Sequence, residues 1–158
     1  QTRGPVCENK VRALLDRWFQ TQADNIFAQR LALWLPTLRA HGVNTPEEKP
    51  PKLRVRAMRS RFGSCSAKGV ITLNRHLINT PLECIDYVLV HELCHLRHFA
   101  HDQNFYSLLH SILPDWRERK VALRKHWAAW EGCHVRKNSR RGGGVGLGVA
   151  GFIIKKKK

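Results

Sequence analysis

The sequence predicts an α+β fold in which helices pack on a small antiparallel sheet. Several segments repeat apolar residues at spacings of three and four, which is typical of helices with one buried face. Two shorter segments alternate apolar and polar residues, as half-exposed strands do. At 158 residues the chain is long enough for a hydrophobic core. We therefore expect one domain over residues 1–134, followed by a basic, glycine-rich, disordered tail over 135–158.

A first helix is expected over residues 6–40. Pro36 removes a backbone donor and is expected to kink or end this helix a turn early. A polar connector with three prolines follows over 42–52. The apolar face of the helix should belong to the core, and it consists of Val11, Leu14, Leu15, Trp18, Phe19, Phe27, Leu31, Trp34, Leu35 and Leu38.

Two strands are expected next, over residues 53–58 and 70–74. Both alternate apolar and polar side chains with a period of two. The segment between them, 63–69, is rich in glycine and serine and favours a turn. The two strands should therefore pair as an antiparallel hairpin. The strand at 70–75 is also the one along which we expect an extended peptide to pair.

The best-specified element is a central helix over residues 81–98. Thr80, Pro81 and Glu83 match a capping box, with a hydroxyl at the N-cap, proline at the first helical position and glutamate at the third. An apolar stripe then recurs at helical spacing through Leu96. Two further helices are expected, over 103–113 and 115–130, with Pro114 between them.

The central helix carries His91-Glu92-Leu93-Cys94-His95, an H-E-x-x-H pattern. Residues four apart on a helix point the same way and lie about 6 Å apart along its axis. Two imidazoles so placed can hold one Zn²⁺ and leave positions for a third ligand and a water. Glu92 lies beside the metal, where it can accept a proton from that water as the general base.

The third ligand has several candidates. His98 shares the helix face of the two histidines but lies about 7–8 Å too far along the axis. His101 comes six residues after His95, a spacing that works if the chain turns back just after the helix. Asp115 or Glu118, from a later helix, could supply a carboxylate instead. We favour His101.

Composition limits the other possibilities. The five cysteines form no C-x-x-C pair, which favours reduced thiols in a cytoplasmic protein. Neither a signal sequence nor an apolar stretch long enough to span a bilayer is present. The net charge is +16, and about half of it comes from eight Lys and Arg residues in the tail. The rest of the chain is still basic, which suits an anionic partner or substrate.

The sequence resembles the YgjP-like metallopeptidase-type family of zincins, which is related more distantly to the SprT-like proteases. The resemblance covers roughly residues 10–130, and its most specific parts are 59–69, 71–78, 86–96, His101, Phe105 and 114–116. It implies a zincin-like fold, with His91, His95 and His101 as metal ligands and Glu92 as the catalytic carboxylate. Family members generally carry a further β-rich N-terminal segment, so we expect this chain to be truncated.

Three functions are compatible with these observations. The first is a zinc-dependent hydrolase of metallopeptidase type, acting on a peptide. The second is a metal-dependent nucleoside triphosphate pyrophosphatase with a UTP-like substrate, because the basic residues Arg54, Arg56, Arg59, Arg61 and Lys68 suit phosphates and some family members are regarded as such enzymes. The third is a nucleic-acid-associated protein in which zinc is structural. The sequence does not predict the oligomeric state, and for a transition-state helper it offers only Asn104, Tyr106 and His110 as candidates.

Overall fold

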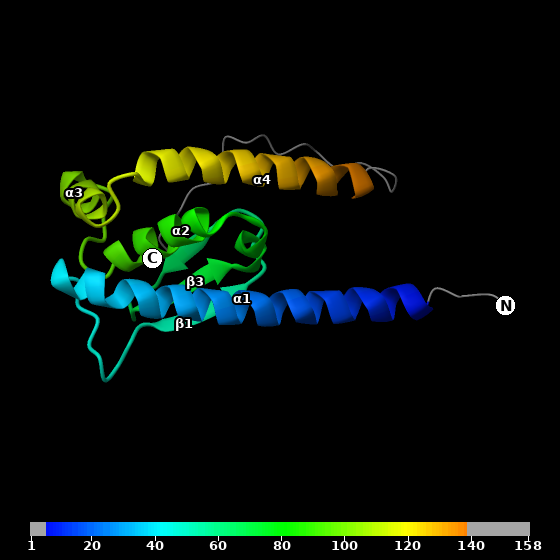
Figure 1. The fold of residues 1–158 in the computed structure, drawn as a ribbon, viewed down its shortest axis with the longest axis horizontal. Helices are drawn as coiled ribbons and strands as arrows, with labels where there is room; N and C mark the ends of the chain where they lie inside the picture. The colour runs from blue at the N-terminus through cyan, green and yellow to red at the C-terminus, as the bar shows by residue number, and fades with distance from the viewer. Residues whose placement is uncertain (1–5, 139–158) are drawn as a thin grey trace.

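The computed structural model describes residues 6–138, with side chains for residues 9–130. Figure 1 shows two long helices on opposite sides of a shorter helix and a small sheet, which confirms the predicted α+β class. The elements of the described part are α1 (Val6–Ala40), β1 (Lys52–Arg56), β2 (Gly63–Cys65), β3 (Val70–Asn74), the 3₁₀ helix η1 (Arg75–Asn79), α2 (Leu82–Cys94), α3 (Gln103–Ile112) and α4 (Trp116–Asn138). Helix α4 reaches four residues into the predicted tail, and residues 139–158 lie outside the described part.

Helix α1 has the predicted bounds, but it does not end at Pro36. It continues to Ala40, and its end is set by Gly42, which adopts a φ of 74°. This left-handed conformation lets Val43 N donate to Leu38 O at 3.0 Å, closing the last turn of the helix. A side chain at Gly42 would also collide with the guanidinium of Arg97.

The apolar face of α1 enters the core along only half of the helix. The second half is buried as predicted, with Phe27 and Leu38 fully covered. In Figure 1 the first half extends past the sheet. The prediction of a continuous core face is therefore wrong for four residues that are about half exposed, namely Val11, Leu14, Leu15 and Trp18.

The sheet has the strand order β1-β3-β2 and is mixed, so the predicted antiparallel hairpin between residues 53–58 and 70–74 is wrong. Strands β1 and β3 run parallel, with Leu53 opposite Ile71. Strand β2 lies within the segment predicted as a turn and pairs antiparallel with β3, with Ser64 opposite Thr72. Three residues rich in small side chains give no strand pattern, which is why β2 was not predicted.

Asn74 holds the loop between β1 and β2 in place. Its side-chain Nδ2 donates to Met58 O at 2.9 Å and to Arg61 O at 2.7 Å. Its backbone N donates to Phe62 O at 2.8 Å. Asn74 is fully buried, so these bonds are shielded from water. They fix the entrance of β2, and with it the place where β2 meets α2.

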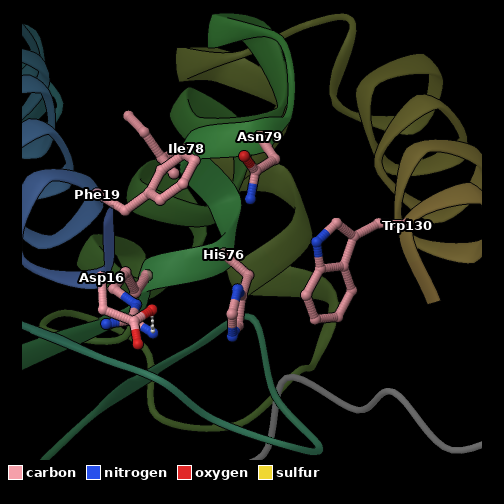
Figure 2. Close-up of a pocket in the computed structure, with 7 residues that line it drawn as sticks. Asp16, Phe19, His76, Ile78, Asn79 and Trp130 are labelled. Carbon is pink, nitrogen blue, oxygen red and sulfur yellow. Dashed lines mark hydrogen bonds and ion pairs between the residues drawn. The ribbon is translucent and has the colours of Figure 1, made fainter. Parts of the chain in front are cut away.

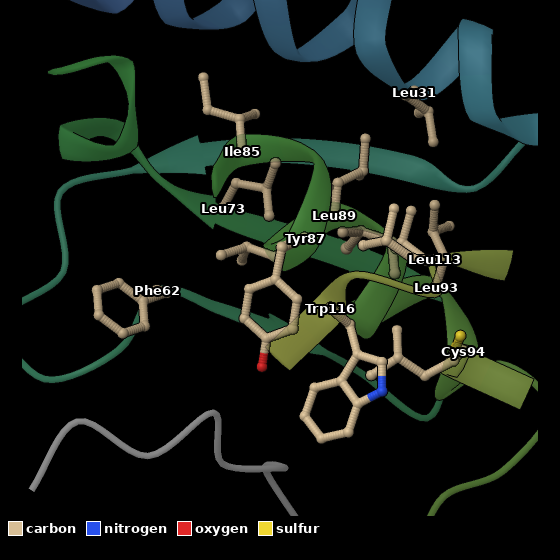
Figure 3. Packing of buried hydrophobic residues seen from close by; sticks show 14 of the residues in the cluster. Leu31, Phe62, Leu73, Ile85, Tyr87, Leu89, Leu93, Cys94, Leu113 and Trp116 are labelled. Carbon is tan, nitrogen blue, oxygen red and sulfur yellow. The ribbon is translucent and has the colours of Figure 1, made fainter. Parts of the chain in front are cut away.

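Helix α2 is central, as predicted. Every residue from Cys84 to Cys94 is buried, because α2 contacts α1, α3, α4 and the sheet. Figure 3 shows Leu89 and Leu93 of this helix among core side chains from α1, β3 and the start of α4. Cys84 and Cys94, both buried in the core, are free thiols.

The predicted capping box is absent, so α2 begins differently. Thr80 ends η1, and its hydroxyl donates to Leu77 O at 2.7 Å. Pro81 is the N-cap, and no side chain caps the helix. The hydroxyl is already used by the preceding turn, which a reading of local sequence alone does not reveal.

An ion pair joins α1 to α2 inside the protein. Arg30 binds Asp86 through two of its donor nitrogens, Nε to Oδ1 at 2.7 Å and Nη2 to Oδ2 at 2.6 Å. Arg119 of α4 lies 3.7 Å from the same carboxylate. Only 5% of the Asp86 side chain is exposed, so one acidic group ties three helices together.

We expect Asp86→Asn to lower the free energy of unfolding by about 2–3 kcal/mol, because it leaves the partly buried Arg30 without its counter-charge and removes one of the two acids near Arg119. Urea denaturation checks this value. Asp16→Asn is the matched control, because Asp16 is 59% exposed and pairs with Arg75 at 3.4 Å. The control substitution should lower the free energy of unfolding by less than about 1 kcal/mol. Equal losses in the two variants would show that the buried pair contributes no more than a surface pair.

Candidate metal centre

His91 and His95 lie on the last turn of α2 and at its C-cap. Both side chains are 3% exposed, so their rings are fixed by packing. The ring centroids lie 5.2 Å apart, as expected for residues one turn apart on a helix. His95 Nδ1 donates to His98 O at 3.0 Å, which leaves its Nε2 as the nitrogen for a metal. Thus His98 contributes its backbone carbonyl to the centre.

The helix ends at Cys94, four residues earlier than predicted. The next turn is tighter, because the backbone N of His95, Leu96 and Arg97 each donates to the carbonyl three residues earlier. Arg97 then reaches back to His41 O at 2.6 Å, which ties the turn to the end of α1. The chain reverses here without a residue of positive φ, so a glycine is not required.

His101 is brought to the centre by the start of α3. Asp102 is the N-cap of that helix, and its side chain accepts from Phe105 N at 2.9 Å. His101 is the residue immediately before this cap, so its position is set by the capped end of the helix. Its side chain is exposed, unlike those of His91 and His95, and it therefore marks the open side of the centre.

The structure brings His91, His95 and His101 together. Their potential ligand atoms lie within 4.8 Å of one another, and Nε2 of His91 and Nε2 of His101 are 2.9 Å apart. Nitrogen ligands of a tetrahedral zinc ion are about 3.3 Å apart, because each bond is about 2.0–2.1 Å long. The three nitrogens thus need only small movements to hold such an ion.

The rival carboxylates are not part of this group. Asp115 accepts from Arg119 Nε at 2.9 Å, one turn along α4, and its side chain is 53% exposed. Glu118 is also exposed. Among the described residues the three histidines form the group suited to a metal, without a fourth side-chain ligand. One position of a tetrahedral ion is therefore left for water.

Phe105 supports all three imidazoles. Its ring centroid lies 4.8 Å from that of His91, 4.6 Å from that of His95 and 4.8 Å from that of His101. The side chain is fully buried and stacks on His95 at an interplanar angle of 27°. Sequence reasoning placed Phe105 on a helix and in the family resemblance, but gave it no role at the site. Its spacing four residues after His101 is a signal that could have indicated this contact.

Burial favours the metal-binding form of His91 and of His101. Loss of hydration lowers the pKa of His91 well below its usual value, and the neighbouring histidines and the Lys120 charge lower it further. Burial and Lys120 also lower the pKa of His101. A lowered pKa favours the neutral imidazole at physiological pH, and neutral imidazole is the metal ligand.

Glu92 is the buried carboxyl group beside the three histidines. It is 1% exposed, and its Oε1 has no hydrogen-bond partner among the described residues. Burial raises its pKa well above the usual value, while the charge of Arg61 acts in the opposite direction. A Cβ at Gly63 would lie 2.9 Å from Glu92 Cγ, so β2 approaches the carboxyl group closely only because residue 63 is glycine.

Helix α4 adds residues to which sequence reasoning gave no role at the site. Trp116 stacks on Tyr106 with ring centroids 5.3 Å apart, and Tyr106 in turn lies 6.3 Å from His101. Lys120 follows Trp116 by one turn. Of the three transition-state helpers considered from sequence, Tyr106 lies beside the centre, whereas Asn104 and His110 are exposed on α3.

A pocket of about 290 Å³ lies elsewhere, between α1, η1 and α4 (Figure 2). Phe19, Ile78 and Trp130 contribute its apolar walls. Asp16 and Arg75 form an ion pair in its lining. No residue of the metal group lines this pocket. None of the helices in the described part combines the length and apolar character needed to cross a membrane.

Comparisons with known proteins identify a family and a shared fold. The family model described as "YgjP-like, metallopeptidase domain" matches residues 2–126. A search of curated proteins found no match. Among solved structures, the metallopeptidase zymogen abylysin of Pyrococcus abyssi is similar, with a TM-score of 0.50 and 22% identity over 65% of this chain and 92% of that one. At this identity the likeness shows a shared fold.

Proposed function

The chain belongs to the YgjP-like metallopeptidase family, and we propose that it is a zinc-dependent peptidase with His91, His95 and His101 as ligands. The observation that carries the proposal is the convergence of three imidazoles beside a buried carboxyl group. Imidazole donors suit zinc, and three of them leave a position for water, as catalytic sites require. Zinc bound there would supply a Lewis acid and lower the pKa of that water.

Glu92 is the proposed general base. It follows His91 directly on α2, so its side chain lies beside the ligand face of the helix and not on it. Its raised pKa brings proton uptake closer to neutral pH, where a base of this kind works best. Glu92 accepts a proton from the attacking water and returns it to the departing amine.

An extended peptide would pair with β2 and not with the strand expected from sequence. Strand β3 has neighbours on both sides and offers no edge, so the expectation for 70–75 is wrong. Strand β2 is an edge strand, and its Gly63 approaches Glu92. A peptide added along the outer edge of β2 by main-chain hydrogen bonds would lie beside the proposed base.

The two rival functions gain less support. Neither the family match nor the structural neighbour points to a nucleotide or a nucleic acid. Of the five basic residues considered for phosphates, Arg61 alone has a charge that acts on Glu92, and Arg54 and Arg56 lie on β1 beside α1. A structural zinc site would have four protein ligands, whereas the described residues offer three. We also propose a cytoplasmic location, because the buried Cys84 and Cys94 are free thiols.

Zinc analysis combined with activity assays tests this proposal. The purified protein should contain one zinc per chain and cleave casein or members of a peptide library. A chelator should abolish cleavage, and added Zn²⁺ should restore it. Each nucleoside triphosphate is assayed in parallel for pyrophosphate release. Metal-dependent pyrophosphate release without cleavage of any peptide would overturn the peptidase assignment and favour the second function.

A further inference from the structure

A row of three side chains on α4 faces the metal centre. Trp116, Lys120 and Arg124 follow one another at intervals of four, so they share one face of the helix. Lys120 Nζ lies 5.8 Å from the centroid of the Trp116 ring, and that ring stacks on Tyr106 beside His101. Lys120 is half-buried and Arg124 is exposed, so the row runs from the centre toward solvent.

Packing places Lys120 beside the centre. Helix α4 contacts α2, which carries His91, and the contacts of Lys120 with Trp116 and of Trp116 with Tyr106 lead to His101. Arg124 reaches the same region, because its charge acts on Lys120 and on Tyr87, one turn before His91 on α2. The row therefore places two positive charges alongside the ligand face of α2.

These charges lack a counter-charge within the described residues. In the described part of α4, Arg119 is the residue that forms ion pairs. It binds Asp115 and lies near Asp86. Glu92 is the buried acid of the centre, and the charge that acts on it is that of Arg61, on the β2 side. A half-buried ammonium group beside a metal dication is unfavourable unless an anion joins them. The arrangement is thus suited to an anionic ligand.

We propose that Lys120, assisted by Arg124, binds a carboxylate of the substrate, so that the enzyme prefers peptides with an acidic residue next to the cleaved bond. This inference rests on the proposed peptidase function. A lysine supplies a compact charge that can contact a single carboxylate, and the exposed Arg124 can attract the same group from solvent. Acting on one side chain of the substrate, the pair sets specificity and takes no part in the proton transfers.

Matched peptides test the inference. The peptides share one sequence except at a single residue next to the cleaved bond, which is Glu, Gln or Lys. In one set this residue precedes the bond, and in a second set it follows the bond. For the wild-type enzyme we expect kcat/KM to be at least about tenfold higher for Glu than for Gln, as a charged hydrogen bond allows. Lys120→Met should remove this preference, and Lys120→Glu should reverse it in favour of Lys. Lys125→Glu, an exposed change on another side of α4, should keep the wild-type order.

The outcomes separate this inference from the proposed function. Equal losses for all peptides in Lys120→Met, with zinc content unchanged, would mean that Lys120 acts on the reaction or on the fold and would overturn the inference. If the wild-type enzyme cleaves no peptide, the peptidase function fails. Calorimetric measurement of peptide binding to the zinc-loaded protein then tests carboxylate recognition by itself. Tighter binding of the Glu peptide that is lost in Lys120→Met supports carboxylate recognition. Binding of UTP without discrimination among the peptides overturns it.

Discussion

Glu92→Gln is expected to lower kcat/KM for peptide hydrolysis by a factor of about 10³, within the range of about 10²–10⁴ typical of a general base. Glutamine matches glutamate in shape but cannot accept the proton from the attacking water. Because Glu92 is not among the three grouped histidines, zinc content should stay at one per chain. Steady-state kinetics with a fluorogenic peptide, together with metal analysis of the same preparation, measure both quantities.

Stability of the metal-free protein provides the control for folding. Burial raises the pKa of Glu92 in the folded state above 4.5, its ordinary value. The unfolded carboxyl group then loses its proton at a lower pH than the folded one, so wild-type stability falls as the pH rises from 4.5 through the folded pKa. Glutamine has no such loss. The metal-free variant should therefore be more stable than wild type at pH 7, and the difference should shrink as the pH falls toward 4.5.

If metal-free Glu92→Gln is less stable than wild type at pH 7, its loss of activity is caused by a folding defect. Full metal-dependent hydrolysis by a well-folded Glu92→Gln protein would mean that another group accepts the proton.

The helices were largely predictable because their signals are local. The apolar spacing in α1 and the H-E-x-x-H pattern on α2 each lie within a few turns of one segment. The sheet was not predictable in the same way, because its order depends on pairing between distant segments. The bonds that Asn74 makes to Met58 and Arg61 fix the entrance of β2, yet they come from residues 13 and 16 positions apart. The short segment 63–65 gives no local sequence signal for these bonds.

The candidate site also has one part that local sequence predicts and another that depends on distant contacts. Two histidines and Glu92 follow from spacing on one helix, whereas the arrival of His101 depends on a tightened turn and on the cap that Asp102 makes for α3. Lys120 is near the centre because α4 packs against α2, and a lysine on an amphipathic helix gives no sign of that in the sequence. Charge reasoning from totals favoured an anionic ligand and considered the basic residues from Arg54 to Lys68, whereas the charges that we propose for such a ligand lie on α4.

His101→Ala is expected to weaken zinc binding by more than the roughly 10–100-fold that loss of a supporting outer-shell group causes, because it removes a proposed direct ligand. The ring of His101 is exposed and Asp102, not His101, caps α3, so the metal-free variant should unfold at nearly the wild-type urea concentration. Competition with a chromophoric chelator of known zinc affinity measures the change in binding.

Asp115→Ala and Glu118→Ala are the matched comparisons, because these carboxylates were the rivals for the third position. Asp115 pairs with Arg119 at an exposed site, so its loss should cost less than about 1 kcal/mol of stability and leave zinc affinity unchanged. Retained zinc affinity in His101→Ala, combined with its loss in either carboxylate variant, would assign the third ligand to α4. The centre would then have to rearrange on binding, since in the structure the imidazoles of His91, His95 and His101 already converge without either acid.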